Sequence, residues 1–90
     1  LDMYYQLEVL NIVSRINRDG ITVVMVLHDV NQALRCADNV IVMKDGDVVA
    51  AGDAKTTITP ELLADVYRVR GDTLTGADGL PYYVPAEMMK

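Results

Sequence analysis

The sequence contains a single cysteine, Cys36, among its 90 residues. One thiol excludes an internal disulfide framework and is consistent with a reducing compartment. Basic residues are also few, because 8 Lys and Arg against 13 Asp and Glu give a formal net charge of −5. The sequence therefore lacks the overall basic character of a nucleic-acid-binding domain. No apolar run approaches the roughly 18 residues of a membrane-spanning helix, and no signal-peptide pattern is present.

Sequence motifs that bind metals or phosphates are also missing. His28 is the only histidine, so no His and Cys spacing typical of a metal site exists. The glycine-containing turns lack the G-x-x-x-x-G-K-[ST] pattern of a phosphate-binding loop. Cys36 is interpreted as a small core side chain rather than a nucleophile, because no second histidine exists and nothing indicates activation by His28.

Apolar residues, in contrast, make up 51% of the chain. Ninety residues is the size of one small domain or of part of a larger one, and a domain this short is only marginally stable alone. The high apolar content predicts elements that are covered by something larger than the chain itself.

The first half of the sequence alternates helical and strand patterns. Asp2 is a suitable helix cap, and the helix that follows is expected to end at Asp19-Gly20. Residues 21–27 are almost all aliphatic without alternation, which predicts a strand covered on both faces, as in a parallel sheet. Apolar residues then recur at helical spacing after His28 and Asp29. These residues are Val30, Ala33, Leu34 and Ala37.

The second half begins with a predicted strand at residues 40–43. Asp45-Gly46 predicts a tight hairpin that returns the chain through residues 48–51. Thr59 and Pro60 predict a helix start, and two short strands near residues 72–75 and 82–84 form a weaker hairpin pattern. The order of elements predicts one α/β unit with mostly parallel strands and an antiparallel hairpin.

His28 is the strongest candidate for a functional side chain. It lies at the carboxyl end of a predicted strand, where ligands bind in open α/β sheets. A neutral imidazole can donate or accept a hydrogen bond near pH 7. From position alone, a partly buried histidine bonded to the backbone is the favoured alternative. Asp29 is interpreted as a helix cap, and Asn31 and Gln32 as exposed helix residues.

The motifs together resemble the ATP-binding subunits of ABC transporters, which are P-loop NTPases. "TVVMVLHDVNQA" is similar to the switch segment of this family, and "DNVIVMKDGDVVAAGD" is similar to the hairpin that follows it. "LD" matches the end of the D-loop. "TPELLADVYRV" and "GLPYYVP" resemble the tail of the importers for iron siderophores, haem and cobalamin. The family often has Gly-x-Pro after the hairpin, whereas this chain has Gly52-Asp53-Ala54, which leaves the start of the following helix open.

The resemblance implies a role for two residues. His28 corresponds to the switch histidine, which hydrogen-bonds the γ-phosphate of ATP and is not the general base. Asp2 corresponds to the D-loop aspartate, which contacts the opposing subunit of the ATPase dimer. The resemblance also implies ATP and Mg²⁺ as cofactors, and a second ATPase subunit and a membrane permease as partners. It places such a subunit in the cytoplasm, at the inner face of the cell membrane.

The resemblance further implies that residues 1–90 are the carboxyl-terminal part of an incomplete ATPase domain. The family's other nucleotide-binding motifs all precede the D-loop, so the stretch alone is expected to be inactive and to retain no cofactor. We also expect it to self-associate, because residues 21–27 would lack their neighbouring strands. The alternative is a free-standing, non-catalytic α/β interaction module. A small receiver-like domain is disfavoured, since no acidic cluster follows the first strand.

Overall fold

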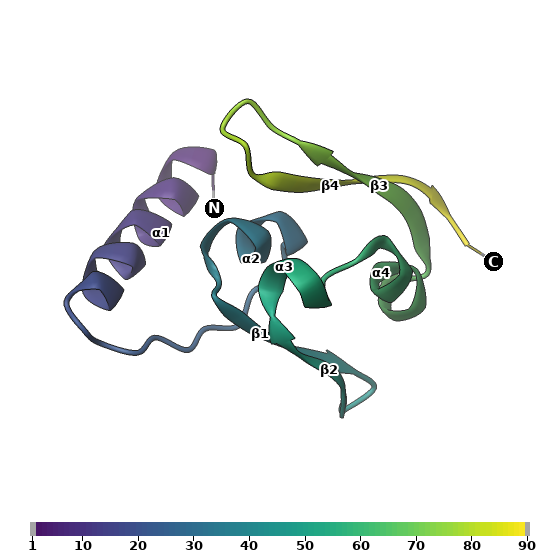
Figure 1. Ribbon diagram of the computed structural model, residues 1–90, viewed down its shortest axis with the longest axis horizontal. Coiled ribbons are helices and arrows are strands. Elements are labelled where there is room, and N and C mark those ends of the chain that lie inside the picture. Colours follow the sequence, from purple (N-terminus) through teal and green to yellow (C-terminus); the bar gives the residue numbers. More distant parts are fainter. Residues whose placement is uncertain (1, 90) are drawn as a thin grey trace.

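A computed structural model describes residues 2–89 of the chain, so Leu1 of the Leu-Asp pair lies outside the described residues. Along these residues two helices, two strands, two helices and two strands follow one another (Figure 1). The helices are α1 Met3–Arg18, α2 Val30–Cys36, α3 Ala54–Thr57 and α4 Pro60–Tyr67, and the strands are β1 Asn39–Lys44, β2 Asp47–Asp53, β3 Val69–Thr75 and β4 Pro81–Met88.

The three predicted helix starts are confirmed. Asp2, Asp29 and Thr59 each accept a hydrogen bond from a first-turn backbone N–H, at 2.8–3.1 Å. Such bonds satisfy N–H groups that have no partner within the helix. Pro60 occupies the first position of α4, where its missing N–H costs nothing. The short helix α3, capped by Asp53, has no counterpart among the predicted elements.

The hairpin predicted at Asp45-Gly46 is also confirmed. β1 and β2 pair antiparallel around this turn. Asp45 has a φ of 53° and Gly46 a φ of 84°. Two consecutive left-handed residues match the twist of the flanking strands, which explains the preference for Asp-Gly in such turns. A bulge follows, because Val42 pairs with Ala50 whereas Met43 pairs with Val48.

The second hairpin is longer than its sequence pattern predicted. β3 and β4 pair antiparallel from the Val69 and Met88 pair to the Thr75 and Pro81 pair. Both sheets of residues 2–89 are two-stranded and antiparallel. The α/β class is therefore correct in its coarse sense, but the expectation of mostly parallel strands is wrong for the described part of the chain.

The strand predicted at residues 21–27 is the clearest difference from the structure. This segment is extended but pairs with no other part of residues 2–89 (Figure 1). It is also not covered on both faces, since Val24 is 92% exposed and Val26 is 84% exposed. A strand requires a neighbouring backbone to satisfy its N–H and C=O groups, and apolar β-branched residues cannot supply one by themselves.

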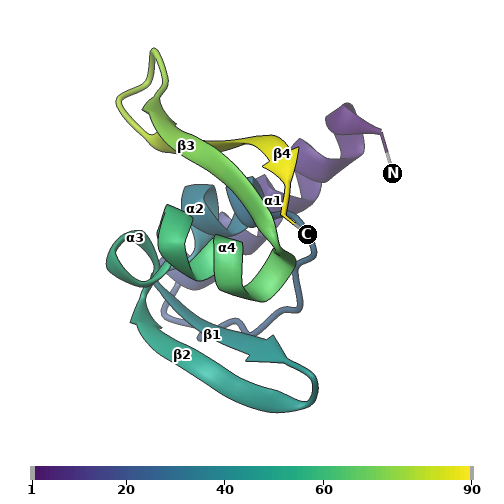
Figure 2. The same ribbon diagram turned by 90° about the vertical axis from the view of Figure 1, so that its right-hand side faces the viewer.

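The core lies between the two hairpins. Figure 2 shows α2 and α4 between β3–β4 on one side and β1–β2 on the other. Leu34 from α2, Leu63 from α4 and Tyr83 from β4 are buried and pack together. Partly buried residues surround them, namely Val30, Ile58 and Val69. α1 lies to one side of this core and buries only Leu10 among its apolar residues (Figure 1).

Candidate functional site

His28 is positioned by the start of α2. It lies between the unpaired segment 21–27 and Asp29, the residue that caps the helix. Its side chain is exposed, and no hydrogen bond or ion pair joins its imidazole to the rest of residues 2–89. The alternative of a partly buried histidine bonded to the backbone therefore does not describe His28 in this structure. The imidazole is free to contact a ligand or another chain.

Asp29 fixes the backbone that directly follows His28. Its Oδ1 atom accepts hydrogen bonds from the backbone N–H groups of Asn31, at 2.8 Å, and Gln32, at 3.4 Å. Both bonds are those of a helix cap, as predicted, and a carboxylate at a helix start is also favoured by the helix dipole. Asp29 therefore fixes the start of α2 directly after His28, while its side chain stays exposed.

Asn31 is a residue whose role the sequence did not reveal. Its Oδ1 atom accepts a hydrogen bond from the backbone N–H of Tyr83 at 2.7 Å, and its Nδ2 atom donates to the carbonyl oxygen of Tyr83 at 3.0 Å. The interpretation of Asn31 as an exposed helix residue is wrong, because the side chain is partly buried against β4. No sequence signal could have indicated a partner 52 residues away.

Asp2 and His28 are not brought into a shared site by the described part of the chain. The Oδ1 atom of Asp2 accepts a hydrogen bond from the backbone N–H of Tyr5 at 3.1 Å, and the Asp2 side chain is exposed. No hydrogen bond or ion pair within residues 2–89 joins it to His28. Asp2 thus caps α1 while its carboxylate stays accessible from outside the chain.

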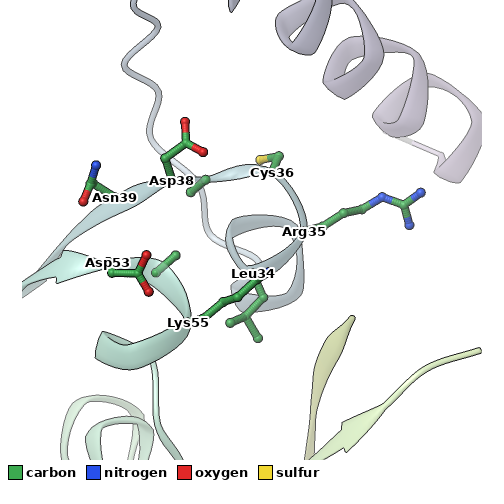
Figure 3. A pocket seen from close by; sticks show the side chains of 9 residues that line it. Leu34, Arg35, Cys36, Asp38, Asn39, Asp53 and Lys55 are labelled. Atoms are coloured by element: carbon green, nitrogen blue, oxygen red, sulfur yellow. The ribbon is translucent and has the colours of Figure 1, made fainter. Parts of the chain in front are cut away.

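An open depression lies at the carboxyl end of α2 (Figure 3). His28 precedes the amino end of the same helix. Its volume is about 310 Å³. The lining residues come from the end of α2 and from the neighbouring ends of β1, β2 and α3: Leu34, Arg35, Cys36, Ala37, Asp38, Asn39, Asp53, Ala54 and Lys55. The charged side chains are mixed in sign, and Arg35 points away from the hollow in Figure 3. Because its lining does not include His28, the depression is separate from the candidate site.

Cys36 lies on the rim of this depression and is exposed, so its interpretation as a core side chain is wrong. Partial burial of the sulfur raises the pKa of the Cys36 thiol above its ordinary value, and the nearby carboxylate of Asp38 raises it further. A raised pKa keeps the thiol protonated near neutral pH, and the protonated form is a poor nucleophile. That Cys36 is not a nucleophile stays a prediction.

Within the described residues, His28 is the side chain that the resemblance assigns to contact with ATP. No group of three or more His, Cys, Asp or Glu within these residues is arranged to hold a metal ion. A nucleoside triphosphate is normally held by several backbone and side-chain donors. The imidazole of His28 would supply one of these contacts. None of the described helices is long and apolar enough to cross a membrane.

Known proteins that resemble this chain are named as ATP-binding proteins for import or transport. No protein-family model matches the chain. The hemin import ATP-binding protein HmuV of Rhodopseudomonas palustris (strain BisB5) is 38% identical over 85 residues, which are 94% of this chain and 33% of that protein. The petrobactin import ATP-binding protein FpuC of Bacillus anthracis is 33% identical over 91 residues, covering 100% of this chain and 33% of that protein. The ferric enterobactin transport ATP-binding protein FepC of Escherichia coli (strain K12) is 41% identical over 71 residues, which are 78% of this chain and 26% of that protein.

The chain spans about a third of the length of these relatives. The similarity nevertheless covers nearly all of the chain, including the His28 segment and both hairpins. By its sequence, the chain belongs to the family of ABC transporter ATP-binding subunits.

Proposed function

We propose that this chain is part of the ATP-hydrolysing subunit of an ABC importer for iron siderophores, haem or cobalamin. The observation that carries the proposal is similarity over 94% to 100% of the chain to proteins named for hemin and petrobactin import. In this proposal the longer protein works in the cytoplasm at the inner face of the membrane. Its partners are a second copy of the ATPase subunit and a membrane permease.

His28 is the residue that this chain contributes to hydrolysis in the longer protein. Its exposed side chain, without a partner within residues 2–89, supports a role in contacting the γ-phosphate. Catalysis of phosphoryl transfer depends mainly on positioning and on stabilising charge, so a well-placed hydrogen bond is sufficient. The remaining groups that hold ATP and Mg²⁺ come from other parts of the longer protein, and the 90-residue stretch alone is inactive.

Replacement of His28 in the longer protein tests this function. His28→Ala is expected to lower the rate of ATP hydrolysis by about 10²–10³, because a hydrogen bond to developing charge matters most in the transition state. ATP affinity, measured by titration with a labelled nucleotide, should remain close to that of the unchanged protein. Gln32→Ala is the control, since the Gln32 side chain makes no hydrogen bond within the described residues. Unchanged hydrolysis in His28→Ala would refute the role of His28.

The 90-residue stretch alone is proposed to self-associate. Residues 21–27 form no strand pairing within residues 2–89, and beyond Ile21, which is hydrogen-bonded to Ile16 and Asn17, their backbone N–H and C=O groups are available to another chain. Exposed strand-like segments of this kind are templates for pairing with another chain. Val24 and Val26, which are largely exposed, would also be covered by such pairing.

A further inference from the structure

We propose that Asn31 is a positioning residue for His28. Its side-chain amide binds the start of α2 to β4 through hydrogen bonds. The β3–β4 hairpin thereby sets the orientation of the backbone at His28. This inference rests on the proposed function, in which His28 contacts a phosphate, but it concerns a different residue and a different interaction.

The contact between Asn31 and β4 has the geometry of a strand pairing. A single residue of β4, Tyr83, has both its backbone N–H and its backbone C=O bonded to the Asn31 side chain, at 2.7 and 3.0 Å. Near neutral pH, where Asp and Glu are ordinarily ionised, the amides of Asn and Gln are the side chains that present a donor and an acceptor side by side in this way. The two bonds therefore fix both the distance and the rotation of α2 relative to β4.

The β3–β4 hairpin holds Tyr83, the partner of Asn31, in a fixed position. Tyr83 is 5% exposed and packs with Leu34 and Leu63 in the core. Its backbone continues the antiparallel pairing with β3, where Thr73 is its partner. Because the same residue is held by the core through its ring and by Asn31 through its backbone, β4 cannot shift without moving the start of α2.

His28 depends on this anchor because the chain holds it from one side only. The backbone N–H of Asn31 is bonded to Asp29, which directly follows His28. On the other side, residues 21–27 form no strand pairing within residues 2–89, and the hydrogen bonds of this segment are those of Ile21 to Ile16 and Asn17, at its far end from His28. The described contacts that orient His28 therefore run from β4 through Asn31 and Asp29.

Two substitutions of Asn31 separate this role from general packing. Asn31→Asp keeps an acceptor for the N–H of Tyr83 but places a carboxylate oxygen against the Tyr83 carbonyl, which removes one bond and adds repulsion. Asn31→Ala removes both bonds. Gln32→Ala is the matched control, because Gln32 is the next residue of α2, is also partly buried, and makes no side-chain hydrogen bond within the described residues.

Both variants and the control are made in the longer protein and assayed below their unfolding temperatures. We expect kcat for ATP hydrolysis to fall about 10- to 100-fold, because small displacements of a reacting contact are costly. The KM for ATP should stay within about twofold, since the lost interaction acts in the transition state. Hydrogen–deuterium exchange should become faster both at residues 81–85 and at residues 27–30. Gln32→Ala should change neither kcat nor exchange.

Three results would overturn the inference. One is a kcat close to that of the unchanged protein in Asn31→Asp, with only a lower melting temperature, because Asn31 would then be purely structural. A second is faster exchange at residues 81–85 without any change at residues 27–30. The third is an effect of the same size in Gln32→Ala. Should Asn31→Ala fail to fold, Asn31→Asp carries the test.

The proposed function fails in a different way. If His28→Ala hydrolyses ATP normally, His28 has no catalytic role, and the kinetic comparison of the Asn31 variants loses its meaning. The exchange measurement still decides the positioning role, because it reports on the backbone around His28 without reference to ATP.

Discussion

Asp2 combines two roles that substitution can separate. It caps α1 in the structure, and we propose that it contacts the opposing subunit in the ATP-bound dimer. Ser is also a good helix cap but carries no charge. In the longer protein, Asp2→Ser is expected to weaken ATP-dependent dimer formation as much as Asp2→Ala does. Only Asp2→Ala should also weaken the helix, by about 1 kcal/mol.

Sedimentation of the two Asp2 variants with and without ATP measures the dimer, and circular dichroism follows the helix. The loss of hydrolysis should be smaller than in His28→Ala. If Asp2→Ser dimerises like the unchanged protein, the carboxylate is not a dimer contact and Asp2 is a helix cap alone.

Gly71 lies in β3 at a bulge, where the backbone of β4 leaves no room for a side chain. A Cβ atom at this position would overlap the carbonyl oxygen of Val84 and lie 2.8 Å from Pro85 Cα. Both neighbours are backbone atoms, which cannot move away as a flexible side chain can. Gly71→Ala is therefore expected to destabilise the protein by about 1–3 kcal/mol, as overpacking usually does.

Urea unfolding of the chain measures this loss through the midpoint of the transition. Thr73→Ala is the control, because Thr73 is exposed on the same strand and such substitutions usually change stability by less than about 0.5 kcal/mol. Equal midpoints for Gly71→Ala and the unchanged protein would show that the hairpin can open to admit a methyl group.

At the scale of elements, the turn between β3 and β4 contains a titratable contact. The hydroxyl of Tyr82 donates a hydrogen bond to Oδ2 of Asp78 at 2.7 Å, and the Leu80 N–H donates to Oδ1 at 3.0 Å. These bonds favour the charged carboxylate and lower the pKa of Asp78 below its ordinary value of 3.8, with the Tyr82 bond as the largest cause. The same contact raises the pKa of Tyr82 above its ordinary value of 10.0.

The sign of the pH dependence follows from the lowered pKa. A carboxyl whose pKa is lower in the folded state stabilises the turn above pH 3.8, and this contribution is lost as the pH falls through the folded-state value. Tyr82→Phe should raise the pKa of Asp78 towards 3.8 without reaching it, because the Leu80 bond remains. Carboxyl ¹³C chemical shifts measure the pKa directly. Tyr67→Phe is the control, and an unchanged Asp78 pKa in Tyr82→Phe would contradict this account.

The elements that sequence patterns predicted well are those with local causes. Thr59 caps α4 through a bond to a residue three positions away. Asp45 and Gly46 turn the chain through their own backbone conformations. Interactions over such short separations are encoded in a few consecutive residues, so a pattern of residue types is sufficient to predict them.

At the scale of the whole molecule, the prediction concerns the association state of the chain and the unpaired residues 21–27. We predict that the 90-residue chain sediments as more than a monomer at micromolar concentration, through pairing of this segment. Val24→Pro removes a backbone N–H from the middle of the segment and should shift the distribution towards monomer. A monodisperse, folded monomer of the unchanged chain would contradict the prediction.

A second variant distinguishes this contact from association through the first hairpin. Ile41 is an exposed apolar residue of β1, 70% exposed. Ile41→Lys should leave association through residues 21–27 unchanged, because Ile41 lies outside that segment. If Ile41→Lys rather than Val24→Pro yields monomer, the chains associate through β1–β2.

The sequence by itself determined the helix caps and the Asp-Gly turn. It also predicts a role for His28, through the resemblance to ABC ATPases. Only the tertiary structure decided that residues 21–27 have no pairing partner within residues 2–89, that both sheets of this part are antiparallel, and that Asn31 binds β4. The physical reason is separation along the chain. A cap or a tight turn forms between neighbouring residues, whereas a strand pairing, or the bond between Asn31 and Tyr83, depends on which distant segment the fold brings alongside.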